Sequence, residues 1–303
     1  MNHSYKKIIV PALLGTLFLG ACSDDASFEG EGKQQTYSLV VKGITTSGSD
    51  SSEELRDVSV FQFSDGNLYK TQQLTPESNG QSSISALSGS RLYFLTGVTL
   101  PVQEEGITEE EFRNMTIGEG LHNNSAPDFM AAIVELESTP QTRSNQEINV
   151  GMKRGVARID LNTTADSKTL IKEIIIKDAP AETYPFIENA SASDKTVSYL
   201  KKFDPAFGGE QQGIFRIFES KRPVNIILRG TYNEIPISLK MQLPSIERNK
   251  VYELSVLNVG ATVEGIFEIK PWEEGETIIV ISNGKVLQSD PYQFDTIYSI
   301  RPQ

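Results

Sequence analysis

The sequence is poor in the residues that build metal centres and nucleophilic active sites. It contains one cysteine, Cys22, and two histidines, His3 and His122, in 303 residues. One cysteine cannot form a disulfide within the chain, and a zinc site needs several His or Cys ligands at suitable spacing. A G-x-S-x-G nucleophile elbow and a phosphate-binding G-x-x-x-x-G-K motif are also absent from the sequence. We therefore expect no catalytic residue, no metal and no cofactor, and we interpret His122 as an exposed loop residue.

Positive charge and long hydrophobic runs are scarce as well. Lys and Arg number 28 against 40 Asp and Glu, which gives a net charge of −12. This balance excludes nucleic acid or an anionic membrane surface as the partner. The most continuous apolar run, residues 8–19, is shorter than the ~20 residues that span a bilayer. Aromatic and branched residues are nevertheless spread along the chain, so we expect a folded protein.

The first 36 residues have the layout of an export signal followed by a tether. Lys6 and Lys7 precede the apolar run, and small residues end it, as in a secretory signal peptide. Residues 19–22 resemble the lipobox of bacterial lipoproteins. The resemblance implies that residues 1–21 are removed and that Cys22 is acylated (palmitate), so that outer-membrane lipid becomes a partner. Residues 22–36 are then an acidic tether, similar to a surface-export signal. The alternative is an ordinary secreted protein with an incidental cysteine.

The first half of the remaining chain predicts strands and one helix. Asp65-Gly66 stands between two strand-like runs and predicts a hairpin, because a type I′ turn needs positive φ. Thr108 and Glu111 match a capping box and predict a short helix, with Phe112 packing onto a sheet. The predicted strands of this half are residues 37–42, 58–63, 68–70 and 91–96.

The second half predicts further strands with turn residues between many of them. In residues 156–161 apolar positions alternate with Arg158 and Asp160, which predicts a sheet with one wet face. Short strands with turns and few helices indicate an all-β protein built of β-sandwiches. We expect an N-terminal domain over residues 37–164 and a C-terminal domain over residues 165–303. The predicted strands of this half are residues 156–161, 170–176, 224–228, 235–243, 251–257 and 266–269.

The order of several short motifs resembles that of Bacteroidetes fimbrillins, the subunits of type V pili, and of their lipoprotein anchor relatives. The sharpest motif is residues 246–252, whose Arg-Asn-x-x-Tyr core opens a late strand; Trp272 resembles the near-terminal tryptophan of the family. The resemblance implies two tandem transthyretin-like β-sandwich domains, in agreement with the strand pattern. The other matching segments are residues 58–66, 92–95, 107–115, 152–159 and 215–220.

The resemblance also implies assembly by donor-strand exchange. In the family, a trypsin-like protease removes an N-terminal segment that includes the first strand, and the C-terminal strand of another subunit fills the groove. Here residues 37–42 are the candidate removable strand, and cleavage is expected after Lys42 or Arg56. The alternative is that both are ordinary surface residues.

The tail, residues 277–300, is the candidate donor. Five of its last residues alternate and therefore share one face of an extended strand, as insertion into a groove requires. Alternatively, the tail completes its own C-terminal sandwich. The five alternating residues are Tyr292, Phe294, Thr296, Tyr298 and Ile300.

These observations together predict a structural subunit of a cell-surface fimbria with a role in adhesion. We expect export through the general secretion pathway to the outer membrane, with other fimbrial subunits and a host or bacterial surface ligand as partners. Two alternatives remain, an unprocessed lipid-anchored anchor subunit and a glycan-binding surface lipoprotein. The single tryptophan disfavours the latter, because glycan sites favour exposed aromatic platforms.

Overall fold

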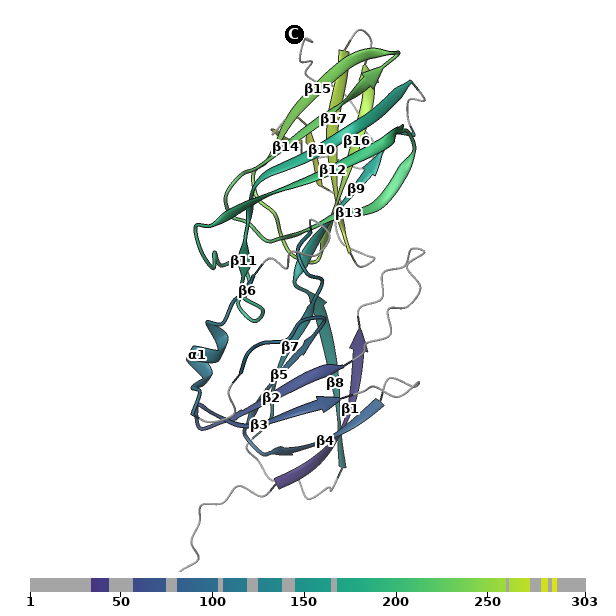
Figure 1. Ribbon diagram of the computed structural model, residues 1–303. Coiled ribbons are helices and arrows are strands. Elements are labelled where there is room, and N and C mark those ends of the chain that lie inside the picture. Colours follow the sequence, from purple (N-terminus) through teal and green to yellow (C-terminus); the bar gives the residue numbers. More distant parts are fainter. Residues whose placement is uncertain are drawn as a thin grey trace, which may run out of the picture. The chain divides into compact units, whose positions relative to one another are not determined.

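The computed structural model describes most of the chain after residue 33 (Figure 1). Lys33–Gln303 forms one compact unit. Within the described residues the protein is nearly all strand, with one short helix in the first half, and the predicted fold class is confirmed. No helix in the described ranges is long and apolar enough to cross a membrane. The described ranges are residues 34–43, 57–74, 81–102, 106–118, 125–137, 145–164, 168–259, 262–272, 279–282 and 285–287.

Seven strands of the first half form what we call the first sandwich. They are hydrogen-bonded in the order β3-β2-β5-β7-β8-β1-β4, and β7 joins β8 through only two pairs, Met130 with Arg154 and Ala131 with Lys153. Buried residues of β2 and β5 share one apolar cluster with buried residues of β4 and β8. The two ends of the strand order therefore enclose a common core, as in a sandwich. The strands are β1 (Gln34–Gly43), β2 (Val58–Ser64), β3 (Asn67–Leu74), β4 (Gln81–Leu87), β5 (Arg91–Thr96), β7 (Met130–Glu135) and β8 (Asn145–Arg154).

The second sandwich consists of a four-stranded sheet, β12-β10-β14-β15, and a six-stranded sheet, β13-β9-β16-β17-β18-β19. Alternate apolar residues of both sheets meet in one buried cluster. A two-stranded ribbon pairs β6 (Ile117–Gly118) with β11 (Glu182–Thr183). The strands of the second sandwich are β9 (Val156–Asn162), β10 (Thr169–Pro180), β12 (Thr196–Phe207), β13 (Glu210–Phe218), β14 (Val224–Tyr232), β15 (Ile235–Leu243), β16 (Lys250–Val259), β17 (Thr262–Pro271), β18 (Ile279–Ser282) and β19 (Lys285–Leu287).

The predicted hairpin and the predicted helix are both confirmed. Asp65 and Gly66 have φ of 51° and 75° and connect β2 to β3. Helix α1 (Glu109–Arg113) is preceded by its N-cap Thr108, which forms a complete capping box with Glu111. Its Phe112 is fully buried against aromatic residues of β2 and β5. Local sequence signals were sufficient here, because the residues that form the turn and the cap lie within a few positions of one another.

The change from one sandwich to the next occurs at Gly155, between β8 and β9. A Cβ at this position would lie 1.9 Å from the ring of Phe129, so any larger residue would displace that ring. Strand β9 pairs with β13 and β16 of the second sandwich, although it precedes the predicted boundary between residues 164 and 165. That boundary stays a prediction.

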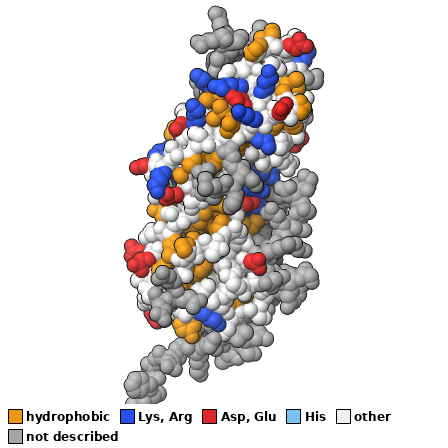
Figure 2. All heavy atoms as spheres, in the orientation of Figure 1, with side chains coloured by type: hydrophobic (Ala, Val, Ile, Leu, Met, Phe, Trp, Pro, Cys, Tyr) orange, Lys and Arg blue, Asp and Glu red, His pale blue; other side chains and the backbone are white. Residues whose placement is uncertain are grey.

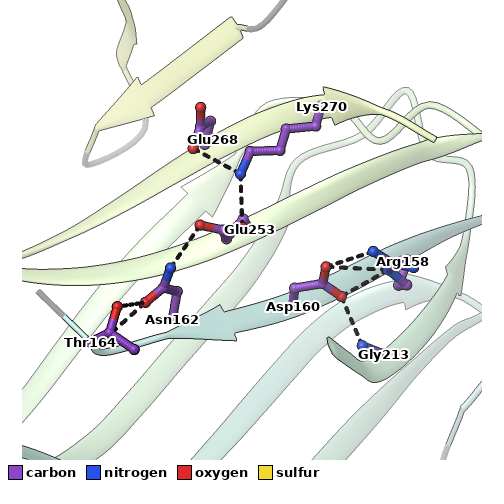
Figure 3. Close-up of polar contacts among 8 residues, drawn as sticks. All are labelled: Arg158, Asp160, Asn162, Thr164, Gly213, Glu253, Glu268 and Lys270. Carbon is purple, nitrogen blue, oxygen red and sulfur yellow. Dashed lines mark hydrogen bonds and ion pairs between the residues drawn. The ribbon is translucent and has the colours of Figure 1, made fainter. Parts of the chain in front are cut away.

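The prediction of a wet face on β9 is wrong at Arg158 and Asp160. Their exposed fractions are 9% and 4%, and they form a buried ion pair with a 2.9 Å N–O distance. The ring of Trp272 covers the guanidinium of Arg158, which lies 5.1 Å from the ring centroid. The backbone N–H of Gly213 donates to Asp160 at 2.7 Å (Figure 3). Alternation shows which residues share a face, but residues distant in sequence decide whether water reaches that face.

Candidate strand-exchange site

Strand β1 lies between two strands that it alone connects. It pairs with β4 in antiparallel direction from Gln34 to Val40, and with β8 in parallel direction from Thr36 to Gly43. Among the described strands, β4 has no other neighbour in the sheet (Figure 1). The first described strand of the chain thus fills a slot between β4 and β8.

The walls of this slot are apolar. Ile84 and Ala86 of β4 and Val150 and Met152 of β8 are at most 2% exposed while β1 is in place, and all four belong to the core of the first sandwich. In register, position 37 of β1 lies opposite Ile84, and positions 41 and 43 lie opposite Val150 and Met152. Alternate positions of β1 therefore lie over the core.

Withdrawal of β1 would have two physical consequences. The backbone N–H and C=O groups of β4 and β8 that now face β1 would lose their partners, which is costly unless they are paired again. The buried row of Ile84, Ala86, Val150 and Met152 would lose its cover, which favours capture of another apolar strand. The slot is therefore chemically suited to exchange one strand for another.

The two predicted cleavage residues differ in their backbone setting. Lys42 lies within β1 and pairs in register with Gly151 of β8. Arg56 lies outside the described residues; Asp57, directly before β2 begins at Val58, is the first described residue after β1. A protease needs an extended, unpaired segment, so cleavage after Lys42 requires the end of β1 to separate from β8 first.

Part of the predicted donor tail is paired in this structure. Ile279–Ser282 pairs with residues 266–269 of β17, and Lys285–Leu287 pairs with β18. This part of the tail extends the six-stranded sheet of its own chain. The five alternating residues from Tyr292 to Ile300 lie outside the described residues, as do Cys22 and His122.

Two segments that carried the family resemblance meet in a buried ion pair. The guanidinium of Arg248 contacts the carboxylate of Glu219, with 8% and 5% of their side chains exposed. Arg248 also donates to the backbone oxygens of Tyr184 at 3.0 Å and Ile187 at 3.2 Å. The next residue, Asn249, has a φ of 59°, and its backbone oxygen accepts a hydrogen bond from the backbone N–H of Trp272. These residues fix the turn that opens β16, so their role is structural.

The outer face of the six-stranded sheet carries a line of polar contacts (Figure 3). Lys270 of β17 pairs with Glu253 of β16 at 2.9 Å, and Glu253 accepts from Asn162 of β9 at 3.1 Å. Burial raises the pKa of Asp160, although the N–H of Gly213 and the charge of Arg158 oppose that effect. Every charged group of this line has a partner, and no group of three or more metal-ligating side chains occurs within the described residues. The contacts from Lys270 to Glu253 and from Asn162 to Glu253 join β17, β16 and β9, so they support the sheet.

Strand β4, which forms one wall of the slot, was not predicted from the sequence. Its Ile84 and Ala86 alternate with Ser83 and Ser85, a period-2 signal that could have revealed a strand. It was not predicted because polar residues, Gln81 and three serines, outnumber its apolar residues. The composition of β4 does not favour a strand strongly, and backbone pairing with β1 stabilises it.

The arrangement of strands defines the class of fold, that of the β-sandwich fimbrial proteins of Bacteroidetes. The tip fimbrial protein Mfa3 of Porphyromonas gingivalis, C-terminally truncated, superposes with a TM-score of 0.59 at 9% identity, covering 79% of this chain and 100% of that one. A fimbrial assembly protein of Parabacteroides distasonis gives 0.55 at 12% identity, covering 83% and 100%. The sequence matches no protein-family model and no curated protein. The predicted resemblance is thus confirmed at the level of the fold.

Proposed function

We propose that this protein is a structural subunit of a cell-surface fimbria that assembles by donor-strand exchange. The observation that carries the proposal is the placement of β1, which comes first among the described strands and is the sole connection of β4 to the sheet. A cut between β1 and β2 leaves β1 held by non-covalent contacts alone. A strand from another subunit then takes its place by pairing with β4 and β8.

The export route rests on Cys22, which is acylated and holds the precursor in the outer membrane until cleavage. We propose Arg56 as the cleavage residue, because Lys42 is paired with Gly151 of β8 and is protected in the folded precursor. Cleavage after Arg56 releases all of β1 together with the lipid. The mature subunit begins at Asp57.

The incoming strand is the tail of a neighbouring subunit. Its residues Tyr292, Phe294, Thr296, Tyr298 and Ile300 enter the slot lined by Ile84, Ala86, Val150 and Met152. Alternation on the donor then matches the alternation of the walls. The fimbria presents the subunits to a host or bacterial surface, and this gives the protein its role in adhesion.

The test is the identity of the N-terminal residue, determined by mass spectrometry on membranes and on sheared surface fibres. We expect Asp57 in the fibres and acylated Cys22 in the membrane precursor. An Arg56→Gln variant should keep the lipid and yield no detergent-resistant ladder of subunits, whereas Lys42→Gln should process normally. Acylated Cys22 alone, in all fractions of the natural protein, would exclude a polymerising subunit and leave a lipid-anchored anchor subunit.

A further inference from the structure

The outward face of the four-stranded sheet carries an apolar row in its centre. Ile175 of β10 pairs in register with Leu200 of β12 and with Ile227 of β14. Their chain neighbours, including Tyr199, Ile176 and Leu228, are buried in the core of the second sandwich, so the row itself points away from that core. Leu200 is 41% exposed. Ile175 and Ile227 are partly exposed. Aliphatic side chains in register across three strands form a continuous, partly exposed patch, and such a patch is typical of an interaction surface.

Lysines surround this row, and we call the whole patch the lysine-rimmed face. Lys240 of β15 lies in register with Ile227, Lys202 lies opposite Glu173 in the adjacent row, and Lys177 lies beside Asn225 on the other side. All three lysines are exposed. Figure 2 shows Lys and Arg side chains around hydrophobic ones where Figure 1 places β10, β12 and β14.

The three lysines have no ion-pair partner among the described residues. The one guanidinium of the face, that of Arg229, is paired with Glu173 at 2.6 Å, and this pair cancels its own charge. Asp178, next to Lys177, accepts a hydrogen bond from Asn225 at 2.7 Å. The face therefore keeps excess positive charge on a chain whose net charge is −12.

We propose that the lysine-rimmed face docks onto the acidic first sandwich of a second copy of this chain. From residue 34 to residue 155 Asp and Glu outnumber Lys and Arg. Glu110 on α1 and Glu137 after β7 are exposed and have no ion-pair partner in the described ranges. An aliphatic centre with a charged rim is the anatomy of a protein–protein interface. The central row contains no aromatic side chain on which a sugar ring could stack, so a protein surface fits better than a glycan.

Contact between two different surfaces is heterologous, and it continues from copy to copy unless the rotation closes a ring. Such docking orders subunits along a line without any exchanged strand. It therefore occurs in the precursor, in which β1 still fills its slot. Docking and strand exchange can be measured separately for this reason.

The experiment measures self-association of the chain from Ser23 onward, with β1 retained, by sedimentation equilibrium. We expect a concentration-dependent assembly that weakens as the salt concentration rises, because screening shortens the range of charge attraction. Lys202→Glu with Lys240→Glu should weaken it about tenfold or more, since like charges then oppose one another. The matched control compares Lys240→Glu alone with Lys221→Glu, which changes the net charge equally at an exposed site outside the lysine-rimmed face; the control should have a much smaller effect.

A charge swap decides which surface is the acceptor. Glu110→Lys with Glu137→Lys should also weaken self-association, and mixing this variant with the Lys202→Glu, Lys240→Glu variant should restore it. A monomeric natural protein at low salt, equal loss in the control, or no recovery on mixing would each overturn the proposal. Retention on immobilised heparin without self-association would overturn it in favour of an anionic glycan. Absence of subunit ladders in cells, with docking intact, would reject strand exchange alone.

Discussion

At the scale of single residues, the buried Arg248–Glu219 ion pair can be tested directly by substitution. Removing one member of a buried pair leaves an uncompensated charge, which costs ~3–5 kcal/mol. We expect Glu219→Gln to lower the free energy of unfolding by about 3 kcal/mol, because Arg248 then keeps only uncharged partners, namely backbone oxygens and the hydroxyl of Thr183. Urea denaturation measures this. The exposed pair Arg222–Asp194 is the control, and Asp194→Asn should cost at most ~1 kcal/mol. Equal losses in the two variants would contradict a special role for burial.

A second prediction at this scale concerns Glu109, the first residue of α1. Burial opposes its ionisation, but hydrogen bonds from Tyr93 and Arg91 outweigh burial and lower its pKa. A carboxyl with a lowered pKa in the folded state stabilises the fold above its ordinary pKa of ~4.3, and this stabilisation is lost as the pH falls. The Glu109→Gln variant should therefore be less stable at pH 7 and lose less stability on acidification. Denaturation curves at several pH values check this. The stability of the control variant Glu110→Gln should change with pH as that of the natural protein does. If the stability of Glu109→Gln also changed with pH in the same way, Glu109 would not be the group responsible.

At the scale of elements, β1 is expected to determine the order of β4. A chain that begins at Asp57 lacks β1, so the amides of residues 81–87 and 145–152 should lose protection from hydrogen exchange. A synthetic peptide of residues 288–303 should restore this protection if it occupies the slot. A peptide with the same residues in scrambled order keeps the composition and removes the alternation. Equal protection by both peptides would show that binding in the slot does not depend on the alternating pattern.

The elements that the sequence predicted are those whose determinants are local. The Asp65-Gly66 turn and the Thr108 cap each depend on residues within four positions, and both are present. Strands β12 and β13 were not predicted, because polar residues interrupt their apolar pattern. The buried state of Arg158 depends on Trp272, which lies more than a hundred residues away. The residues of β1 predicted a strand, but the slot depends on its pairing with β4 and β8, which no local pattern encodes.

At the scale of the whole molecule, a third apolar cluster contains residues of both sandwiches. Phe61 and Phe112 of the first half share it with Phe186 and Trp272 of the second half. The rings of Phe112 and Phe186 stack with centroids 5.2 Å apart, and Arg154 lies 4.7 Å from the ring centroid of Trp272. A shared core couples the stabilities of the parts that contribute to it. In the fibre proposed above, a force applied to one sandwich would then be resisted by both.

This coupling predicts that the two sandwiches unfold in one cooperative transition. Phe186 is buried and contacts both Phe112 and Tyr93, so Phe186→Ala should remove ~3–5 kcal/mol and weaken the coupling as well. Differential scanning calorimetry should give one peak for the natural protein and two for the variant. Phe215→Ala is the control, because Phe215 is equally well buried but lies in the core of the second sandwich alone. Phe215→Ala should lower the stability of the second sandwich. Because the shared cluster stays intact, its calorimetric trace should keep a single peak, at a lower temperature. Two peaks in the natural protein would show that the third cluster does not couple the two sandwiches.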